Sequence, residues 1–285
     1  MKTYIIGNWK MNFTVGEASL FLHKLLQKIR IMRDVEVVVA PSLVALQPLS
    51  LQVDRRKVKL AAQNFCAHDF GAYTGEVSVS QLRSLVNYAI VGHSERRYIF
   101  HETDKDIRAK VSAALRVGLT PILCVGETES ERTFGETADV LRDQVLGGLS
   151  DVSKEDLTKV IIAYEPVWAI SGHGRPAKVA SPLDVADALK LIRSTLKDTY
   201  GKAIAEEIPL LFGGSVKSLN AESYLSVPGC NGLLIGGASL IASDLLQVVF
   251  PSVKLHPNQP PCHFVFMMFC DAIIAQPCVN RKLKR

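Results

Sequence analysis

Polar side chains that can bind charge or move a proton follow three short apolar segments of the chain. Asn8 and Lys10 follow the first segment, His93 and Glu95 the second, and Glu165 the third. A glutamate can act as a general base, a neutral histidine can donate a hydrogen bond to an oxyanion, and lysine or asparagine can stabilise negative charge. Taken singly, each of these residues also fits an ordinary surface, strand-end or first-turn position.

Two groups of small residues follow later apolar segments, Gly213-Gly214-Ser215 and Gly236-Gly237. Glycine pairs usually mark tight turns. After the late strands of a barrel they also suit the close approach of backbone N–H groups to a phosphate. Such a site attracts an anion without a large positive patch.

The elements that must position these residues alternate along the first 250 residues. The expected strands are short, apolar and β-branched: Tyr4–Trp9, Val35–Ala40, Lys59–Gln63, Tyr88–Val91, Pro121–Val125, Val160–Tyr164, Leu210–Gly213 and Leu233–Ile235. Amphipathic helical patterns lie between them, at Gly16–Met32, Asp104–Val117, Glu136–Leu149 and Pro182–Tyr200. This alternation predicts an α/β fold, a single-domain (β/α)8 barrel, with an open doubly wound sheet as the competitor. In a barrel the loops after the strands meet at one end.

Composition excludes several classes of protein. Hydrophobic residues make up 48% of the 285 residues and charged residues 21%, which excludes a disordered chain. No apolar run reaches the roughly 18 residues of a membrane-spanning helix, we expect no signal peptide, and six scattered cysteines favour a reducing compartment. The first 250 residues hold 28 basic and 27 acidic side chains, so no nucleic-acid-binding face is expected. We therefore expect a cytoplasmic protein.

Six stretches resemble the triosephosphate isomerase family, in order, over residues 1 to about 249. They are Gly7-Asn8-Trp9-Lys10-Met11-Asn12, Gly71-Ala72-Tyr73-Thr74-Gly75-Glu76, Gly92-His93-Ser94-Glu95-Arg96-Arg97, Ala163-Tyr164-Glu165-Pro166-Val167-Trp168-Ala169-Ile170, Gly213-Gly214-Ser215-Val216 and Leu234-Ile235-Gly236-Gly237-Ala238-Ser239-Leu240. The resemblance implies a TIM barrel that interconverts dihydroxyacetone phosphate and D-glyceraldehyde 3-phosphate through an enediolate, in glycolysis and gluconeogenesis. It implies no cofactor and no metal ion.

The resemblance also assigns roles at the reacting carbons. Glu165 would be the general base and His93 a neutral electrophile, kept neutral by a helix N-terminus. Lys10 and Asn8 would stabilise negative charge on the substrate. Glu95 would support Lys10 by holding it in place.

Further roles implied by the resemblance concern phosphate and partner binding. Phosphate would be bound by Ser215, Gly236, Gly237, Ser171 and Gly172. The loop 166–181 would be a lid that excludes water. Thr74 would lie in a loop that inserts into the second subunit of a homodimer, with Arg96 and Glu102 as an ion pair nearby. Cys124 would be a packing thiol.

The sequence departs from the family pattern at three places. The lid is about four residues longer than usual. Phe212 stands where the family usually has a tyrosine whose hydroxyl latches the closed lid, which predicts looser closure and a lower turnover that Phe212→Tyr would raise. The barrel is expected over residues 1–249, with a C-terminal extension over 250–285 that begins with helix-breaking Pro251.

The extension carries Cys262, Cys270 and Cys278 beside His263, a spacing that matches no common zinc site. A loosely packed extension without function is the leading interpretation, and we expect no membrane or partner contact from it. A docking segment and an altered reading frame are the alternatives.

Two other functions remain open at the level of sequence. A different phosphate-binding barrel enzyme, such as a sugar-phosphate epimerase or an aromatic amino-acid pathway isomerase, would share the late glycine loops but not the other motifs. A non-catalytic scaffold would keep the barrel and use the extension for binding. Deletion of residues 251–285 separates the scaffold, which loses its partner, from the isomerase, which keeps its turnover.

Overall fold

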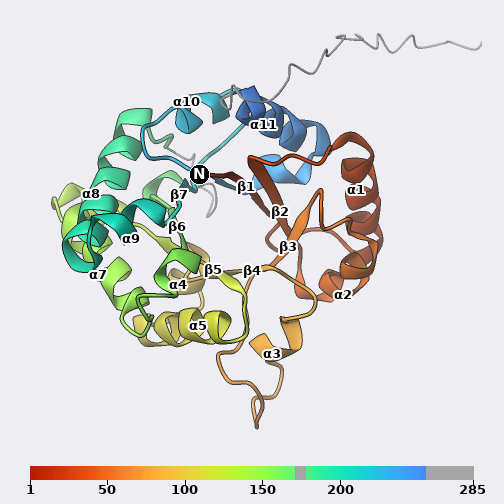
Figure 1. Cartoon of the computed structure of the whole chain (residues 1–285), viewed down its shortest axis with the longest axis horizontal. Helices are drawn as coiled ribbons and strands as arrows, with labels where there is room; N and C mark the ends of the chain where they lie inside the picture. The colour runs from red at the N-terminus through yellow and green to blue at the C-terminus, as the bar shows by residue number, and fades with distance from the viewer. Residues whose placement is uncertain (171–177, 255–285) are drawn as a thin grey trace, which may run out of the picture. The chain divides into compact units, whose positions relative to one another are not determined.

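Eight parallel strands pair in sequence order and close into a barrel. The computed structural model describes residues 1–170 and 178–254. Closure rests on the last strand, β8 (Gly232–Ile235), which pairs with the first, β1 (Thr3–Asn8), so that Gly7 lies opposite Ile235. Figure 1 looks onto this ring of strands, with the helices around it. The (β/α)8 barrel is therefore confirmed, and the open doubly wound sheet is excluded.

The strands lie within one or two residues of their predicted bounds. The other six are β2 (Val35–Ala40), β3 (Lys59–Ala62), β4 (Tyr88–Val91), β5 (Thr120–Val125), β6 (Ile161–Tyr164) and β7 (Leu210–Phe212). Along each strand, successive side chains point into the barrel or out toward the helices. Ile5, for example, belongs to the outer apolar layer, whereas Ile6 belongs to the inner one. Because both faces are covered, the strands are apolar nearly throughout.

Helices follow the strands on the outside of the barrel. They are α1 (Val15–Lys28), α2 (Leu43–Gln52), α3 (Val79–Leu82), α4 (Ser94–Tyr98), α5 (Asp104–Arg116), α6 (Glu129–Thr133), α7 (Thr137–Leu149), α8 (Pro182–Tyr200), α9 (Lys202–Glu207), α10 (Ala221–Leu225) and α11 (Ala242–Lys254). Three single-turn 3₁₀ segments are η1 (Leu157–Lys159), η2 (Val167–Ala169) and η3 (Gly237–Leu240). None of the helices in the described part of the chain could cross a membrane.

Two helices differ from the sequence-based expectation. The first helix ends at Lys28 instead of Met32, because Ile29 turns to an extended conformation and its side chain is buried in the core. The last helix, α11, runs to Lys254 and includes Pro251, so it continues past residue 249, where we expect the barrel to end. Cys262, Cys270, Cys278 and His263 of the extension lie outside the described residues.

The inner layer of the barrel contains Cys124 on β5, whose side chain is buried. Burial, together with the nearby Glu165 carboxylate, raises the pKa of its thiol well above the ordinary value. A thiol that stays protonated is a poor nucleophile. Cys124 is therefore a packing residue, as expected.

Candidate active site

A cavity of about 550 Å³ opens among the loops that follow the strands. Seven of the predicted site residues line it: Asn8, Lys10, His93, Glu165, Ser215, Gly236 and Gly237. They come from the ends of β1, β4, β6, β7 and β8. Closure of the barrel therefore brings together residues that lie far apart in the sequence.

Glu165 is held by the backbones of neighbouring strand ends. It directly follows β6, and its N–H donates to the carbonyl of Val125 at the end of β5 at 2.7 Å. A Cβ atom at Gly126 would lie 1.8 Å from the Glu165 carbonyl oxygen, and one at Gly213 would lie 2.9 Å from Glu165 Cγ. Both positions therefore need glycine. The Glu165 side chain is buried, at 4% exposure.

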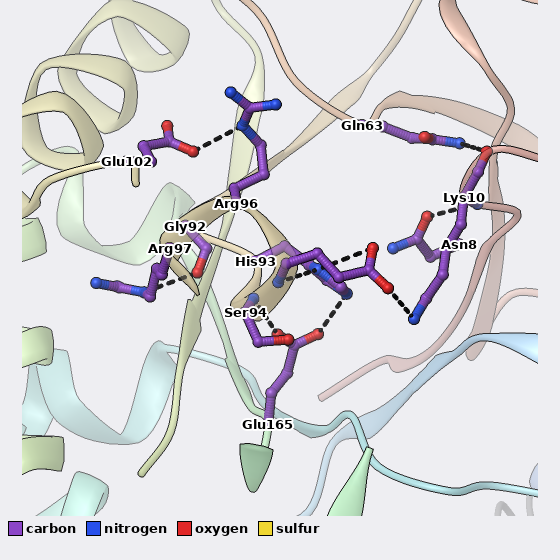
Figure 2. A network of polar contacts seen from close by, with 11 residues as sticks. Asn8, Lys10, Gln63, Gly92, His93, Ser94, Arg96, Arg97, Glu102 and Glu165 are labelled. Atoms are coloured by element: carbon purple, nitrogen blue, oxygen red, sulfur yellow. Dashed lines mark hydrogen bonds and ion pairs between the residues drawn. The ribbon is translucent and has the colours of Figure 1, made fainter. Parts of the chain in front are cut away.

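The His93 and Glu165 side chains lie next to one another in the lining of the cavity (Figure 2). His93 Nε2 lies 3.2 Å from Glu165 Oε1, and the Ser94 N–H donates to Glu165 Oε2, also at 3.2 Å. The other ring nitrogen, Nδ1, accepts a hydrogen bond from the Glu95 N–H at 3.2 Å, and the Glu95 carboxylate is farther away, at 3.7 Å. An Nδ1 that accepts carries no proton. The contacts therefore describe a neutral imidazole whose Nε2–H points at Glu165.

Hydrogen bonds from Arg97 hold the turn that precedes His93. Gly92 has a φ of 68°, in the left-handed region that favours glycine. The Arg97 guanidinium donates to the Gly92 carbonyl at 2.8 Å and to the Cys124 carbonyl at 3.1 Å. His93 itself is the N-cap residue of α4. These contacts fix the backbone from which the His93 side chain projects, and so fix the orientation of its imidazole ring.

Lys10 projects into the cavity from a strained backbone. Its φ is 51°, which is unusual for a residue other than glycine. Asn8 Oδ1 accepts the Lys10 N–H at 3.0 Å, and Gln63 Nε2 donates to the Lys10 carbonyl at 2.8 Å. Lys10 Nζ then pairs with Glu95 Oε1 at 2.7 Å. The predicted support of Lys10 by Glu95 agrees with this ion pair.

Asn8 and Gln63 flank Lys10 in Figure 2, and the Asn8 amide nitrogen lies on the side that faces His93 and Glu165. The Asn8 side chain is buried, with its oxygen already used by the Lys10 backbone. Its amide hydrogens are therefore the part of the side chain that can donate to a ligand.

The small residues after β7 and β8 form the other wall of the cavity. The Lys10 Cε atom would lie 3.6 Å from a Cβ at Gly236, so the lysine side chain passes beside the glycine pair. Ser215 Oγ donates to the Ala169 carbonyl at 2.8 Å, which ties the end of β7 to η2. A cation and small residues thus share this wall. Ser171 and Gly172, the other predicted phosphate contacts, lie outside the described residues.

Comparison with known proteins decides the family. A family model described as triosephosphate isomerase matches residues 3–251. The chain belongs to the triosephosphate isomerase family. Triosephosphate isomerase of Chloroherpeton thalassium is 44% identical over 250 residues, which cover 87% of this chain and 98% of the relative.

Two further triosephosphate isomerases show a similar likeness. That of Caldanaerobacter subterraneus is 44% identical over 246 residues, covering 86% of this chain and 97% of the relative. That of Flavobacterium johnsoniae is 41% identical over 249 residues, covering 87% of this chain and 98% of the relative. The predicted resemblance to triosephosphate isomerase is confirmed, and with it the assignment as an isomerase. The interpretation as a different phosphate-binding barrel enzyme is set aside.

The structure does not bring every predicted residue of the triosephosphate isomerase site to the cavity. Thr74 is exposed, on the loop between β3 and α3 that projects away from the strands in Figure 1. The Arg96–Glu102 ion pair exists, with 2.8 Å between Nε and Oε2, and Lys110 also pairs with Glu102. Figure 2 shows the Arg96–Glu102 pair apart from Lys10.

Three polar residues that support the site are absent from its sequence-based prediction. Gln63 holds the Lys10 backbone, Arg97 holds the turn before His93, and the fully buried Glu127 accepts hydrogen bonds from Tyr164 at 3.0 Å and from the Trp168 indole at 2.8 Å. Gln63 and Glu127 each follow a buried strand, and that position was the available signal. Nothing in the local sequence names their distant partners.

Proposed function

We propose that this cavity interconverts dihydroxyacetone phosphate and D-glyceraldehyde 3-phosphate, with Glu165 as the base. The observation that carries the proposal is the 3.2 Å approach of the Glu165 carboxylate to His93 Nε2, in a cavity that Lys10 also lines. A carboxylate, a neutral imidazole donor and a cation are the groups that proton abstraction beside a carbonyl requires. Family membership supports the choice of substrate.

The proposed reaction moves one proton between adjacent carbons. Glu165 takes the proton from the carbon beside the carbonyl, and the electron pair of that C–H bond passes to the carbonyl oxygen as the enediolate forms. His93 Nε2–H donates a hydrogen bond to that oxygen, while Lys10 and the Asn8 amide stabilise its negative charge. Protonated Glu165 then returns the proton to the neighbouring carbon, and a hydroxyl proton moves between the two oxygens.

The contacts of the Glu165 carboxylate indicate what substrate binding must change. Glu165 is engaged by His93 on one oxygen and by the Ser94 N–H on the other. A substrate oxygen that accepts the Nε2–H of His93 would replace Glu165 as its partner. The carboxylate would then be released toward the substrate carbon, so that ligand binding itself activates the base.

Phosphate binding is proposed on the opposite wall, at the backbone amides of Ser215, Gly236 and Gly237, together with Ser171 and Gly172. The passage of Lys10 beside Gly236 supports this placement because it adds a cation to the site. The loop 166–181 is proposed to cover the bound substrate and exclude water. Its proposed function rests on the family resemblance.

We also propose a cytoplasmic homodimer. The β3–α3 loop supports a dimer because it carries Phe70, which is 90% exposed, and the exposed Tyr73 and Thr74. Large apolar side chains exposed together on a projecting loop favour a protein–protein contact. The small number of cysteines supports a reducing compartment.

The test is a coupled assay of glyceraldehyde 3-phosphate isomerisation by the full chain and by Glu165→Gln. The variant keeps the size of the side chain but cannot act as a base, so kcat should fall by about 10²–10⁴-fold. Glu155→Gln, at an exposed position, is the matched control and should leave kcat unchanged. A chain that folds without any turnover would favour the scaffold; since α11 ends at Lys254, the deletion that tests the extension should begin at residue 255.

A further inference from the structure

Tyr224 on α10 is a buried tyrosine to which the proposed mechanism gives no role. Its side chain is almost fully buried, yet its hydroxyl donates to the backbone carbonyl of Ala180 at 2.7 Å. Ala180 is buried as well and lies near the end of the loop 166–181. A buried hydroxyl that bonds to a loop backbone fixes that backbone, because breaking the bond leaves a buried polar group without a partner.

The point that Tyr224 holds is where the loop rejoins the barrel. Ala180 directly precedes Ser181, the N-cap residue of α8. Ser181 and Asp184 form a capping box, in which each side chain accepts a hydrogen bond from the other residue's backbone. The exit of the loop is therefore held by the Tyr224 hydroxyl on one residue and by the helix cap on the next.

The same network reaches the entry of the loop. Asp184 pairs with Arg132 at 2.6 Å, and the Arg132 guanidinium lies 4.4 Å from the centre of the Trp168 ring in η2. Trp168 in turn donates to Glu127. The entry and the exit of the loop are thus both fastened to the barrel through described residues.

Tyr224 also contacts the strand that leads into the cavity. Its ring centre lies 4.4 Å from that of Phe212, the last residue of β7. Phe212 is followed by Gly213, where a Cβ atom would lie 2.9 Å from Glu165 Cγ. Ser215 of the same turn donates to Ala169 in the loop entry. A single aromatic pair therefore joins the exit of the loop to the turn beside the catalytic base.

We propose that Tyr224 is a positioning residue for the isomerisation. Its hydroxyl fixes the Ala180 carbonyl, and its ring sets the exit of the loop 166–181 against the end of β7. Phe212 has no hydroxyl, and the adjacent tyrosine supplies one to the loop instead. Phe212 alone predicts a loosely held loop, whereas the Tyr224 hydroxyl fastens the exit of that loop from α10. The proposal rests on the proposed function, in which this loop covers the substrate.

The test removes one oxygen atom at each of two buried sites. Tyr224→Phe deletes the hydroxyl that bonds to Ala180. Tyr88→Phe is the matched control, because the Tyr88 hydroxyl donates to Glu36 at 2.6 Å at the N-terminal end of β4, away from the cavity. Both variants lose a hydrogen bond of similar length, so both should unfold at a slightly lower urea concentration.

The two variants should differ in catalysis. For Tyr224→Phe, kcat/KM should fall by about three- to tenfold, as expected for the loss of one hydrogen bond that matters in the transition state. A larger share of turnovers should end in release of inorganic phosphate, because an enediolate that the loop covers less well can expel its phosphate group by β-elimination. Tyr88→Phe should match the wild type in kcat/KM and in phosphate release. Equal kinetic constants and equal phosphate release in all three proteins would overturn the proposal.

A second readout does not depend on activity. Trypsin cleaves after lysine, and Lys178 lies two residues before Ala180 in an exposed stretch. Cleavage after Lys178 should be several-fold faster in Tyr224→Phe than in the wild type and in Tyr88→Phe. Unchanged cleavage in Tyr224→Phe would contradict the role in holding the loop. Absence of isomerisation in the wild type would instead overturn the proposed function and leave this cleavage result to be judged by itself.

Discussion

At the scale of single residues, Lys10 shows how the chain places a cation against its backbone preference. A left-handed conformation costs a non-glycine residue about 1–3 kcal/mol. The conformation is held by Asn8 on the Lys10 N–H and by Gln63 on the Lys10 carbonyl, while Gln63 also donates to the Ala40 carbonyl at 2.8 Å. The neutral side chains of Asn8 and Gln63 hold the Lys10 backbone, and the ion pair with Glu95 orients the Lys10 ammonium group.

Gln63→Met tests this arrangement. Methionine has a similar length but no donor, so the Lys10 and Ala40 carbonyls both lose a hydrogen bond. We expect kcat/KM to fall by about ten- to a hundredfold, because a displacement of about 1 Å at a catalytic group has an effect of this size. Gln52→Met, on the exposed end of α2, should leave kcat/KM unchanged. Wild-type kinetics in Gln63→Met would show that Lys10 does not depend on Gln63.

The residues proposed to carry the chemistry could be named from the sequence, but most of their supports, Glu95 excepted, could not. Asn8, Lys10, His93 and Glu165 lie in motifs that resemble the triosephosphate isomerase family, and they line one cavity. The partner of Tyr224 lies 44 residues away, so no local pattern connects the two. A contact of this kind follows from how the loops fold back, which sequence alone leaves undetermined.

At the scale of elements, the ends of β5 and β6 pack so closely that one of them needs glycine. The Glu165 N–H bonds to Val125, and the next residue, Gly126, faces the Glu165 carbonyl with no room for a side chain. Gln144 on α7 holds Gly126 at both its N–H and its carbonyl, at 2.8 and 3.2 Å. The backbone of Glu165, the proposed base, is therefore set by backbone packing between two strands.

Gly126→Ala should displace Glu165 and lower kcat by about 100-fold, because the new Cβ atom forces the Glu165 backbone to move. Gly147→Ala is the control. It lies inside α7, where a Cβ atom meets nothing within 4 Å, and it should raise the free energy of unfolding by about 0.5–1 kcal/mol. Assay and urea denaturation of both variants separate the two effects. Normal activity in Gly126→Ala would contradict the steric argument.

Strands were easier to predict than helix ends. Eight short apolar runs correspond to eight strands because both faces of a parallel strand are buried. The end of α1 depends on Ile29, which continues the apolar periodicity of the helix yet packs in the core in an extended conformation. At the C-terminal end of the barrel sequence, Pro251 lies inside α11, although proline usually ends a helix. Tertiary packing of the Ile29 side chain decides the first case.

At the scale of the whole molecule, carboxylates in hydrogen bonds and ion pairs make the free energy of unfolding depend on pH. Burial alone would raise the pKa of Asp184, but hydrogen bonds from Ser181 and the ion pair with Arg132 outweigh it and hold the pKa below the ordinary value. For Glu36, burial is likewise outweighed by hydrogen bonds from Lys2 and Tyr88, and its pKa is lowered. Carboxyl groups with a lowered pKa stabilise the fold above their unfolded pKa, and this contribution is lost as the pH falls through the folded value.

Stability should therefore be nearly constant from pH 7 to about 5 and should fall between about pH 4 and 3, near the ordinary carboxyl pKa. Urea denaturation at several pH values measures this. Asp184→Asn should be less stable than the wild type at neutral pH. It should also lose less stability on acidification, because the variant lacks the Asp184 carboxyl group, whose pKa is lowered by folding. A wild-type free energy of unfolding that rises toward pH 3 would contradict the assignment.

The closed barrel brings Glu165 to within 3.2 Å of His93, where we propose that a proton is transferred between carbons. Isomerisation in D₂O, followed by NMR of the product, tests it most directly. A carboxylic acid exchanges its proton with solvent, so the account predicts deuterium on the carbon that Glu165 protonates, and loss of both isomerisation and labelling in Glu165→Gln. A product without deuterium, formed at an unchanged rate by Glu165→Gln, would contradict it.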